Sequence, residues 1–213
     1  MDENLSLYRY MKPMPDGTEV KLPVENLTVQ YCISSEALNA GNHAFGGTWG
    51  GRDSTFHHNL FACNTGRNPS IGMSGEFDYR NNVIFNWRHR TIDGGDETSL
   101  INVINNYYKP GPAANRNMRN VIARIEERDM YSPGKCRVGA VWYPNLGLGP
   151  GNWYPKMEPR PGKGYVAGNY FAEYPDITAN NWAGMRGPES KARVHTPFEG
   201  WPVNQESAID AYH

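Results

Sequence analysis

The sequence has few cysteines and no long hydrophobic run, and these absences exclude several classes of protein. No apolar stretch in its 213 residues is long enough to cross a bilayer as a helix. The three cysteines have no Cys-x-x-Cys spacing, so neither a zinc site nor a disulfide framework is indicated, and we expect Cys32 and Cys63 to pack as small apolar residues. The net charge of −1 gives no overall attraction to polyanions, so we expect no nucleic-acid and no membrane partner.

Lysine is scarce as well, because 14 of the 21 cationic residues are arginines. Arginine binds planar carboxylates through two parallel hydrogen bonds, whereas lysine acts as a point charge. The first residues, Met1 to Ser6, lack the basic start and the apolar stretch of a signal peptide. Glycine (23 residues) and proline (16 residues), in contrast, are abundant, which favours short strands joined by turns over long helices.

A short repeated phrase predicts the fold. An asparagine is followed directly by an apolar strand at Asn59, Asn82 and Asn106, which are 23 and 24 residues apart. A fixed period in this range is typical of a solenoid, in which each turn of chain buries its apolar side against the next. Residues one period apart then lie above one another, so we expect an asparagine ladder. We interpret the ladder as structural, because asparagine side chains bond turn backbone and tolerate a left-handed conformation.

The strand pattern places the turns of this solenoid. Residues 26–34 alternate apolar and polar, which is typical of a strand with one buried face. Further strands bounded by turn residues are expected at 54–62, 77–87, 100–108 and 165–171. We therefore expect a single all-β domain over 1–213, with rungs at about 1–112 and 162–172 and mostly loops at 113–161 and 173–213.

Three runs, Phe56 to Pro69, Phe77 to Trp87 and Asn105 to Pro112, resemble the pectate lyase family, specifically proteins similar to polysaccharide lyase family 1. The motifs occur in order at rung spacing, and the resemblance covers roughly residues 1–112. It implies a right-handed parallel β-helix with long coil wrapped around its C-terminal half. It also implies a chain truncated at both ends, whose full-length parent is secreted or periplasmic, and we expect a monomer.

The resemblance implies cleavage of an acidic polysaccharide, pectate or a related uronan, by β-elimination. In that reaction a base removes the proton at C5 of the uronate, calcium neutralises the adjacent carboxylate, and the C4–O bond breaks. The family's base is the arginine of an Arg-x-Pro motif, which is Arg67 here. A free guanidinium stays protonated, so burial beside calcium and other cations would have to disfavour its charge. The alternative for Arg67 is a salt-bridged turn residue.

Calcium (Ca²⁺) is the cofactor that the resemblance implies. Asp2 matches the first acid of the family's ligand pair, Ser6 stands where the second is expected, and Glu3 is the candidate substitute. Hard cations prefer several carboxylate oxygens, so a site with one or two acids would bind calcium weakly. The alternative interpretation is that Asp2 and Glu3 belong to a solvated terminus.

The resemblance also implies cations for the substrate carboxylates, and two of them are missing from this chain. No lysine occurs where the family places one, and His43 is the nearest polar candidate. The family's second arginine is replaced by Gly72, so we expect Arg80, Arg88 or Arg90 of the next rung to supply a cation.

Two neighbouring histidines complete the candidate substrate site. His57 and His58 are expected on opposite sides of one strand, so that at most one faces a cleft, and His58 is the candidate. Two other functions remain open. The chain is either a noncatalytic carbohydrate-binding β-helix or, less well supported, a hydrolase that uses two facing carboxylates from Asp93, Asp96 and Glu97.

Overall fold

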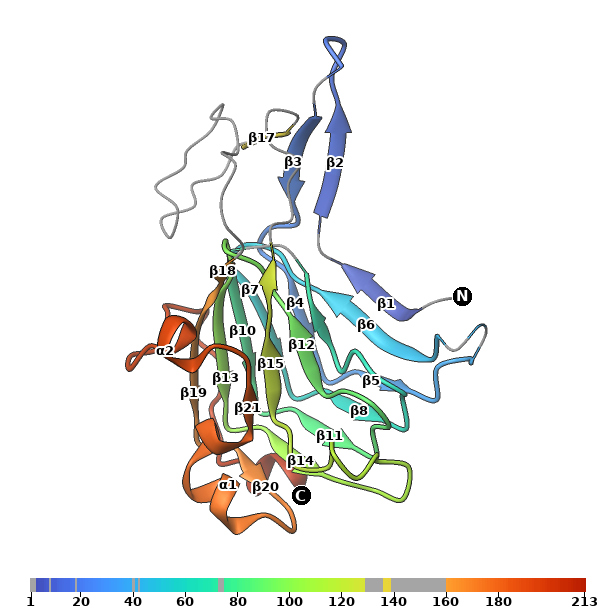
Figure 1. Ribbon diagram of the computed structural model, residues 1–213, viewed down its shortest axis with the longest axis vertical. Helices are drawn as coiled ribbons and strands as arrows, with labels where there is room; N and C mark the ends of the chain where they lie inside the picture. The colour runs from blue at the N-terminus through green and yellow to red at the C-terminus, as the bar shows by residue number, and fades with distance from the viewer. Residues whose placement is uncertain are drawn as a thin grey trace.

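The structure is a computed structural model that describes residues 3–7, 9–17, 19–39, 41, 43–72, 75–128, 136–138 and 160–213. The described residues form a parallel β-helix with three long sheets and very little helix (Figure 1), as the sequence predicts. Each turn of the coil passes through sheet 2, then sheet 3, then sheet 1. Strands of successive turns pair in parallel, so every sheet runs along the whole coil.

The three sheets are defined by their strands. Sheet 1 contains β1 (Glu3–Leu7), β6 (Phe45–Trp49), β9 (Ser70–Ile71), β12 (Ile92–Gly94), β15 (Ala123–Ile125) and β21 (Met185–Arg186). Sheet 2 contains β4 (Thr28–Gln30), β7 (Ser54–His57), β10 (Glu76–Arg80), β13 (Leu100–Ile104) and β19 (Lys163–Ala167). Sheet 3 contains β5 (Ile33–Ser35), β8 (Leu60–Ala62), β11 (Val83–Phe85), β14 (Tyr107–Lys109) and β20 (Tyr170–Phe171).

The remaining elements lie outside the three sheets. A ribbon of β2 (Arg9–Pro13) and β3 (Glu19–Pro23) projects from the coil in Figure 1 and pairs with β17 (Cys136–Val138), while β16 (Glu127–Arg128) pairs with β18 (Arg160–Pro161). The helices are α1 (Pro175–Ala179), η1 (Asn181–Gly184), α2 (Glu189–Ala192) and η2 (Asp210–Tyr212). None of the described helices has the length and apolar character needed to cross a membrane.

The interior of the coil is filled with aromatic and branched side chains that stack from turn to turn. Tyr108 of β14 and Phe171 of β20, for example, lie in parallel planes with ring centroids 5.3 Å apart. The fully buried large side chains are Trp49, Phe56, Phe61, Phe77, Tyr79, Trp87, Tyr108 and Phe171. Each such burial contributes about 1.5–3 kcal/mol, so the core is built rung by rung from the apolar positions of the repeat.

The asparagine ladder is confirmed and is longer than predicted. Asn59 donates from its backbone N–H and its side chain to Oδ1 of Asn82, both at 3.0 Å, and Asn82 bonds Asn106 in the same way at 2.9 and 3.0 Å. Asn106 then bonds Asn169, which bonds Asn181. All five side chains are buried, so the ladder satisfies polar groups inside the coil.

At the corner between sheets 2 and 3, the left-handed residue is not the ladder asparagine but the residue before it. His58, Asn81 and Asn105 have φ angles of 54°, 54° and 52°, and Gly168 has 69° at the same position of a later turn. A left-handed residue ends the strand and reverses which side the next side chain takes. The prediction for Cys32 and Cys63 is wrong, because both belong to turns between strands and are exposed.

Candidate active site

The carboxylate of Glu3 lies at the first strand of sheet 1. In the register of β1 and β6, Glu3 is opposite Phe45. Thr48 of β6 donates to this carboxylate from its backbone N–H at 3.1 Å and from its hydroxyl at 2.6 Å, and the Ser6 hydroxyl also donates to it. The side chain is only 8% exposed. Glu3 is therefore a fixed and largely enclosed carboxylate rather than part of a solvated terminus.

A glycine pair in β6 brings the Arg67 turn against sheet 1. Gly46 donates to the carbonyl of Gly66 at 3.1 Å, and Gly47 donates to the carbonyl of Arg67 at 2.9 Å. A Cβ atom on Gly46 would lie 2.7 Å from that Arg67 carbonyl oxygen, which is closer than a side chain permits. Glycine at this position therefore allows the backbone approach that places the Arg67 side chain beside Glu3.

Two guanidinium groups from successive turns share one aromatic ring. The Cζ atom of Arg67 lies 4.3 Å from the centroid of Phe45, and the Cζ atom of Arg90 lies 5.4 Å from it. Arg67 Nη1 is paired with the Glu3 carboxylate. Arg67 and Arg90 remain 28% and 34% exposed. This face therefore presents two partly accessible cations at adjacent rungs, which is an arrangement suited to an acidic polymer.

The acid that balances Arg90 is buried beneath it. Asp93 of β12 is 1% exposed and accepts from Arg90 Nη1 at 2.6 Å. Asp96 and Glu97, in the turn that follows, are also buried. Asp96 accepts from Thr98 N at 2.8 Å and so holds this turn. Asp93 pairs with Arg90, Asp96 holds the turn, and all three acids are buried, which is contrary to the hydrolase hypothesis.

The structure separates the predicted substrate-binding residues. His43 is exposed and its ring centroid is 4.9 Å from that of Phe45, so it belongs with Glu3 and Arg67. Arg88 is also exposed, but the described residues show no contact of its side chain with this cluster. Arg80 lies on the sheet 2 side, where it pairs with Asp78 at 2.6 Å. Of the three arginines considered for the next rung, Arg90 is the one beside Phe45.

His58 also lies away from Arg67, and the prediction that His57 and His58 point to opposite sides is wrong. Strand β7 ends at His57, and the left-handed His58 turns its ring back, so the two Nδ1 atoms are 2.7 Å apart. His58 stacks on Tyr31 and lies 3.7 Å from the Glu206 carboxylate. Burial, followed by the nearby His58, lowers the pKa of His57.

The described residues do not by themselves make a calcium site. Asp2 lies outside the described residues, and Glu3 is engaged by Thr48, Ser6 and Arg67. Within the described part of the chain, no group of three or more His, Cys, Asp or Glu side chains is arranged to hold a metal ion. Calcium prefers six to eight oxygen ligands. Calcium binding therefore stays a prediction.

The sequence indicates some of this cluster but not all of it. Arg67 and Arg90 are 23 residues apart, which is the spacing of Asn59 and Asn82, so the repeat alone is a signal that they stack. Phe45 precedes Arg67 by 22 residues, which is also about one period, but the sequence does not show that its ring faces the guanidinium groups.

Comparisons with known proteins indicate a pectate lyase-like relationship over part of the chain. No protein-family model matches the chain. A protein of Aspergillus flavus described as "Probable pectate lyase C" is 37% identical over 95 residues, which are 42% of this chain and 21% of that protein. The protein of Aspergillus terreus with the same description is 37% identical over 93 residues, which are 41% of this chain and 21% of that protein. The chain therefore spans about a fifth of the length of the curated relatives that it matches.

Proposed function

We propose that the protein is a polysaccharide lyase that cleaves pectate or a related uronan by β-elimination, with Arg67 as the base. The observation that carries this proposal is the pair of guanidinium groups, Arg67 and Arg90, over the Phe45 ring in a chain that is similar to pectate lyases. We further propose that it acts outside the cytoplasm, where such polymers occur, and that its active form holds calcium near Glu3.

The proposed reaction proceeds without a covalent intermediate. Arg67 accepts the proton from C5 of the uronate, the C4–O bond breaks, and a C4–C5 double bond forms while the departing oxygen takes up a proton. Arg90 and His43 bind substrate carboxylates beside the reacting unit. Preorganised cations stabilise the negative charge that develops on the carboxylate when C5 loses its proton, which is usually the largest contribution in such sites.

The ion pair between Arg67 and Glu3 affects whether Arg67 can act as the base. A guanidinium is a cation at ordinary pH, and here its Nη1 atom is paired with the Glu3 carboxylate. Arg67 has to leave this ion pair and lose a proton before it can act as a base. This observation favours a second candidate function, in which the same cluster binds uronan without cleaving it.

Cleavage of polygalacturonate, with and without added calcium, distinguishes the two functions. The unsaturated product absorbs in the near ultraviolet, and we expect its formation to be lost in Arg67→Ala and retained in Arg116→Ala, which removes an exposed arginine outside the cluster. Binding of uronan oligomers without any product, with binding lost in Arg67→Ala, would establish the second function. Cleavage at an unchanged rate in Arg67→Ala would refute the role of Arg67.

A further inference from the structure

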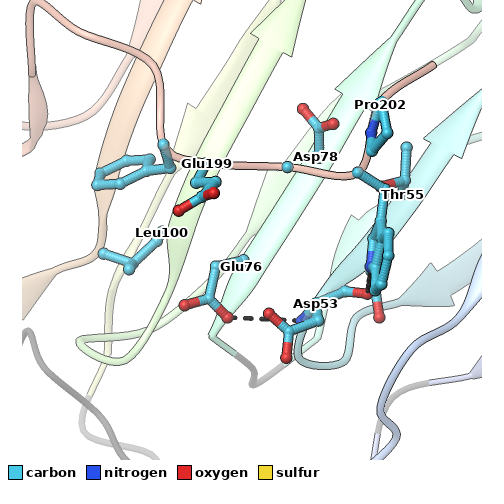
Figure 2. Close-up of a pocket in the computed structure, with 11 residues that line it drawn as sticks. Asp53, Thr55, Glu76, Asp78, Leu100, Glu199 and Pro202 are labelled. Atoms are coloured by element: carbon cyan, nitrogen blue, oxygen red, sulfur yellow. Dashed lines mark hydrogen bonds between the residues drawn. The ribbon is translucent and has the colours of Figure 1, made fainter.

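A cavity lies on the side of the coil away from Arg67, past the end of the sheet 1 strands and at the start of sheet 2. It has a volume of about 400 Å³ and is covered by the C-terminal segment 198–202 (Figure 2). This segment is fixed at both ends. The backbone of Phe198 exchanges two hydrogen bonds of 3.0 Å with the Asn102 side chain, and the indole N–H of Trp201 donates to the carbonyl of Asp53 at 2.9 Å. The cover is therefore a built part of the fold.

Acidic side chains from three segments line this cavity. They are Asp53, Glu76, Asp78 and Glu199, and the described lining residues include no lysine, arginine or histidine. The Nε atom of Arg52 lies 3.4 Å from the Oδ2 atom of Asp53, and Arg80 pairs with Asp78. Among the described residues, no ion pair neutralises Glu76 or Glu199. Figure 2 shows the carboxylates of Asp53 and Glu76 side by side, with Glu199 reaching toward them from the covering segment.

The buried carboxylate of Asp78 indicates independently that a hydrogen-bond donor is missing from this cavity. It is 2% exposed, and its Oδ1 atom accepts from Arg80 at 2.6 Å and from Asn102 at 3.1 Å. Its Oδ2 atom has no hydrogen-bond partner among the described residues. A Cβ atom on Gly200 would lie 2.6 Å from that oxygen, so glycine is needed where the cover meets this carboxylate. A buried carboxylate oxygen without a donor is costly, and a donor that enters the cavity would relieve that cost.

The shape of the cavity favours an organic cation over a metal ion. The described acids are not gathered into a group that can share one metal ion, and the cavity is in the range of small-molecule sites. Phe198 and Trp201 add aromatic surface at the two ends of the covering segment. A cation on an apolar skeleton gains from both the aromatic rings and the carboxylates, whereas a uronate would be repelled.

The geometry points to a binding site for a primary ammonium group on a small organic skeleton, held among Glu76, Glu199 and the Oδ2 atom of Asp78 and packed against Trp201. The ammonium supplies three hydrogen-bond donors, which is the complement of a lining composed of acceptors. Three sources carry this chemistry: a polyamine, an amino sugar and a lysine side chain. The site is separate from the Arg67 cluster and does not depend on lyase activity.

Calorimetric titration of the intact protein tests this site. The probes are 1,5-diaminopentane, D-glucosamine and Nα-acetyl-lysine amide, one for each source, with 1,5-pentanediol as the uncharged match of the first and calcium chloride as the metal. We expect at least one ammonium probe to bind, pentanediol to bind at least tenfold more weakly, and added salt to weaken the complex. The strongest of the three probes identifies the source.

Variants then locate the site. Glu76→Gln and Glu199→Gln keep the size of each side chain, and each is expected to weaken ammonium binding about tenfold or more, which corresponds to the loss of one charge-assisted hydrogen bond. Glu36→Gln, at an exposed glutamate outside the cavity, is the matched control and should leave binding unchanged. The proposal is overturned if no ammonium probe binds, if pentanediol binds equally well, if the two cavity variants weaken the binding of calcium but not of ammonium, or if both cavity variants bind the ammonium probes like the wild type.

Discussion

At the start of the sheet 1 strands, arginines of successive turns lie over one phenylalanine ring, whereas past the other end of those strands carboxylates line a covered cavity. Both sites stand on the same rungs and the same asparagine ladder. They differ in the side chains at the ends of the strands and in the segments that join or cover them. In this coil the repeat determines where a side chain can lie, and the residue type at each strand end or turn decides whether that place is basic or acidic.

The largest expected effect is that of Arg67→Ala, which should change the activity at one site and leave binding at the other unchanged. Arg67→Ala should lower the rate of uronan cleavage by about 10²- to 10⁴-fold, because a general base contributes an acceleration of that size. Ammonium binding at the acidic cavity should not change, since the two sites share no side chain. Product absorbance and calorimetry measure the two properties in one preparation. A variant that keeps its cleavage rate would contradict the assignment.

Removing a ladder residue should damage both sites together. Asn82→Ala leaves the buried backbone N–H of Asn59 without its partner, and it removes the hydrogen bonds that the Asn82 side chain donates to Asn106 Oδ1 and to the carbonyl of Phe56. An orphaned buried donor costs about 1–3 kcal/mol and each further lost bond about 1 kcal/mol, so we expect the free energy of unfolding to fall by roughly 3 kcal/mol. Urea denaturation measures this change, with Asn117→Ala at an exposed asparagine as the control. Equal stability of the two variants would show that the ladder is not a structural support.

Arg90→Ala should give a smaller change, confined to the basic face. We expect weaker substrate binding, seen as an approximately tenfold higher KM, because about 1.5 kcal/mol of charge-assisted hydrogen bonding is lost. Stability should also decrease, since Asp93 loses an ion-pair partner while buried. Arg90→Lys retains the charge but not the planar fork and should recover part of the binding. Wild-type KM in Arg90→Ala would remove Arg90 from the substrate site.

The smallest expected effect is a pH dependence of protein stability that arises from the pair His57 and His58. Burial and the neighbouring His58 lower the pKa of His57 in the folded protein, while Asp78 opposes this shift and Arg80 adds to it. The unfolded chain therefore takes up a proton first as pH falls. Stability from His57 is present above its ordinary pKa and is lost as pH falls through the lowered value.

Thermal unfolding between pH 8 and about pH 5 measures this dependence. His57→Gln should flatten the decrease in Tm toward low pH, whereas His195→Gln, at an exposed histidine, should not. His89, whose pKa is also lowered by burial, leaves a residual slope in both variants. A steeper decrease in His57→Gln than in the wild type would show that the sign is wrong.

The sequence allows the fold to be predicted more fully than the candidate sites. The 23-residue spacing of Asn59 and Asn82 is a local signal, and it was enough to predict the ladder and the parallel coil. The acidic cavity, in contrast, arises from contacts between residues far apart in the chain. Trp201 and Asp53, for example, are 148 positions apart. No periodicity marks such a contact, because the covering segment is not part of the repeat.

The histidine pair shows a different limit. Strand alternation predicts opposite sides for His57 and His58 only if both belong to the strand. A single left-handed residue at the corner ends the alternation, and non-glycine residues occupy that conformation at several corners of this coil. The sequence gives the period of the corners but not their backbone angles.

The central claim is that the Arg67 and Arg90 face binds the carboxylates of a uronan. Calorimetric titration of trigalacturonate and of its uncharged methyl ester into the wild type and into an Arg67→Ala, Arg90→Ala double variant tests it most directly. The wild type should bind the acid at least about tenfold more tightly than the ester, and the double variant should not distinguish them. Equal affinities in the wild type, or undiminished discrimination in the double variant, would contradict the claim.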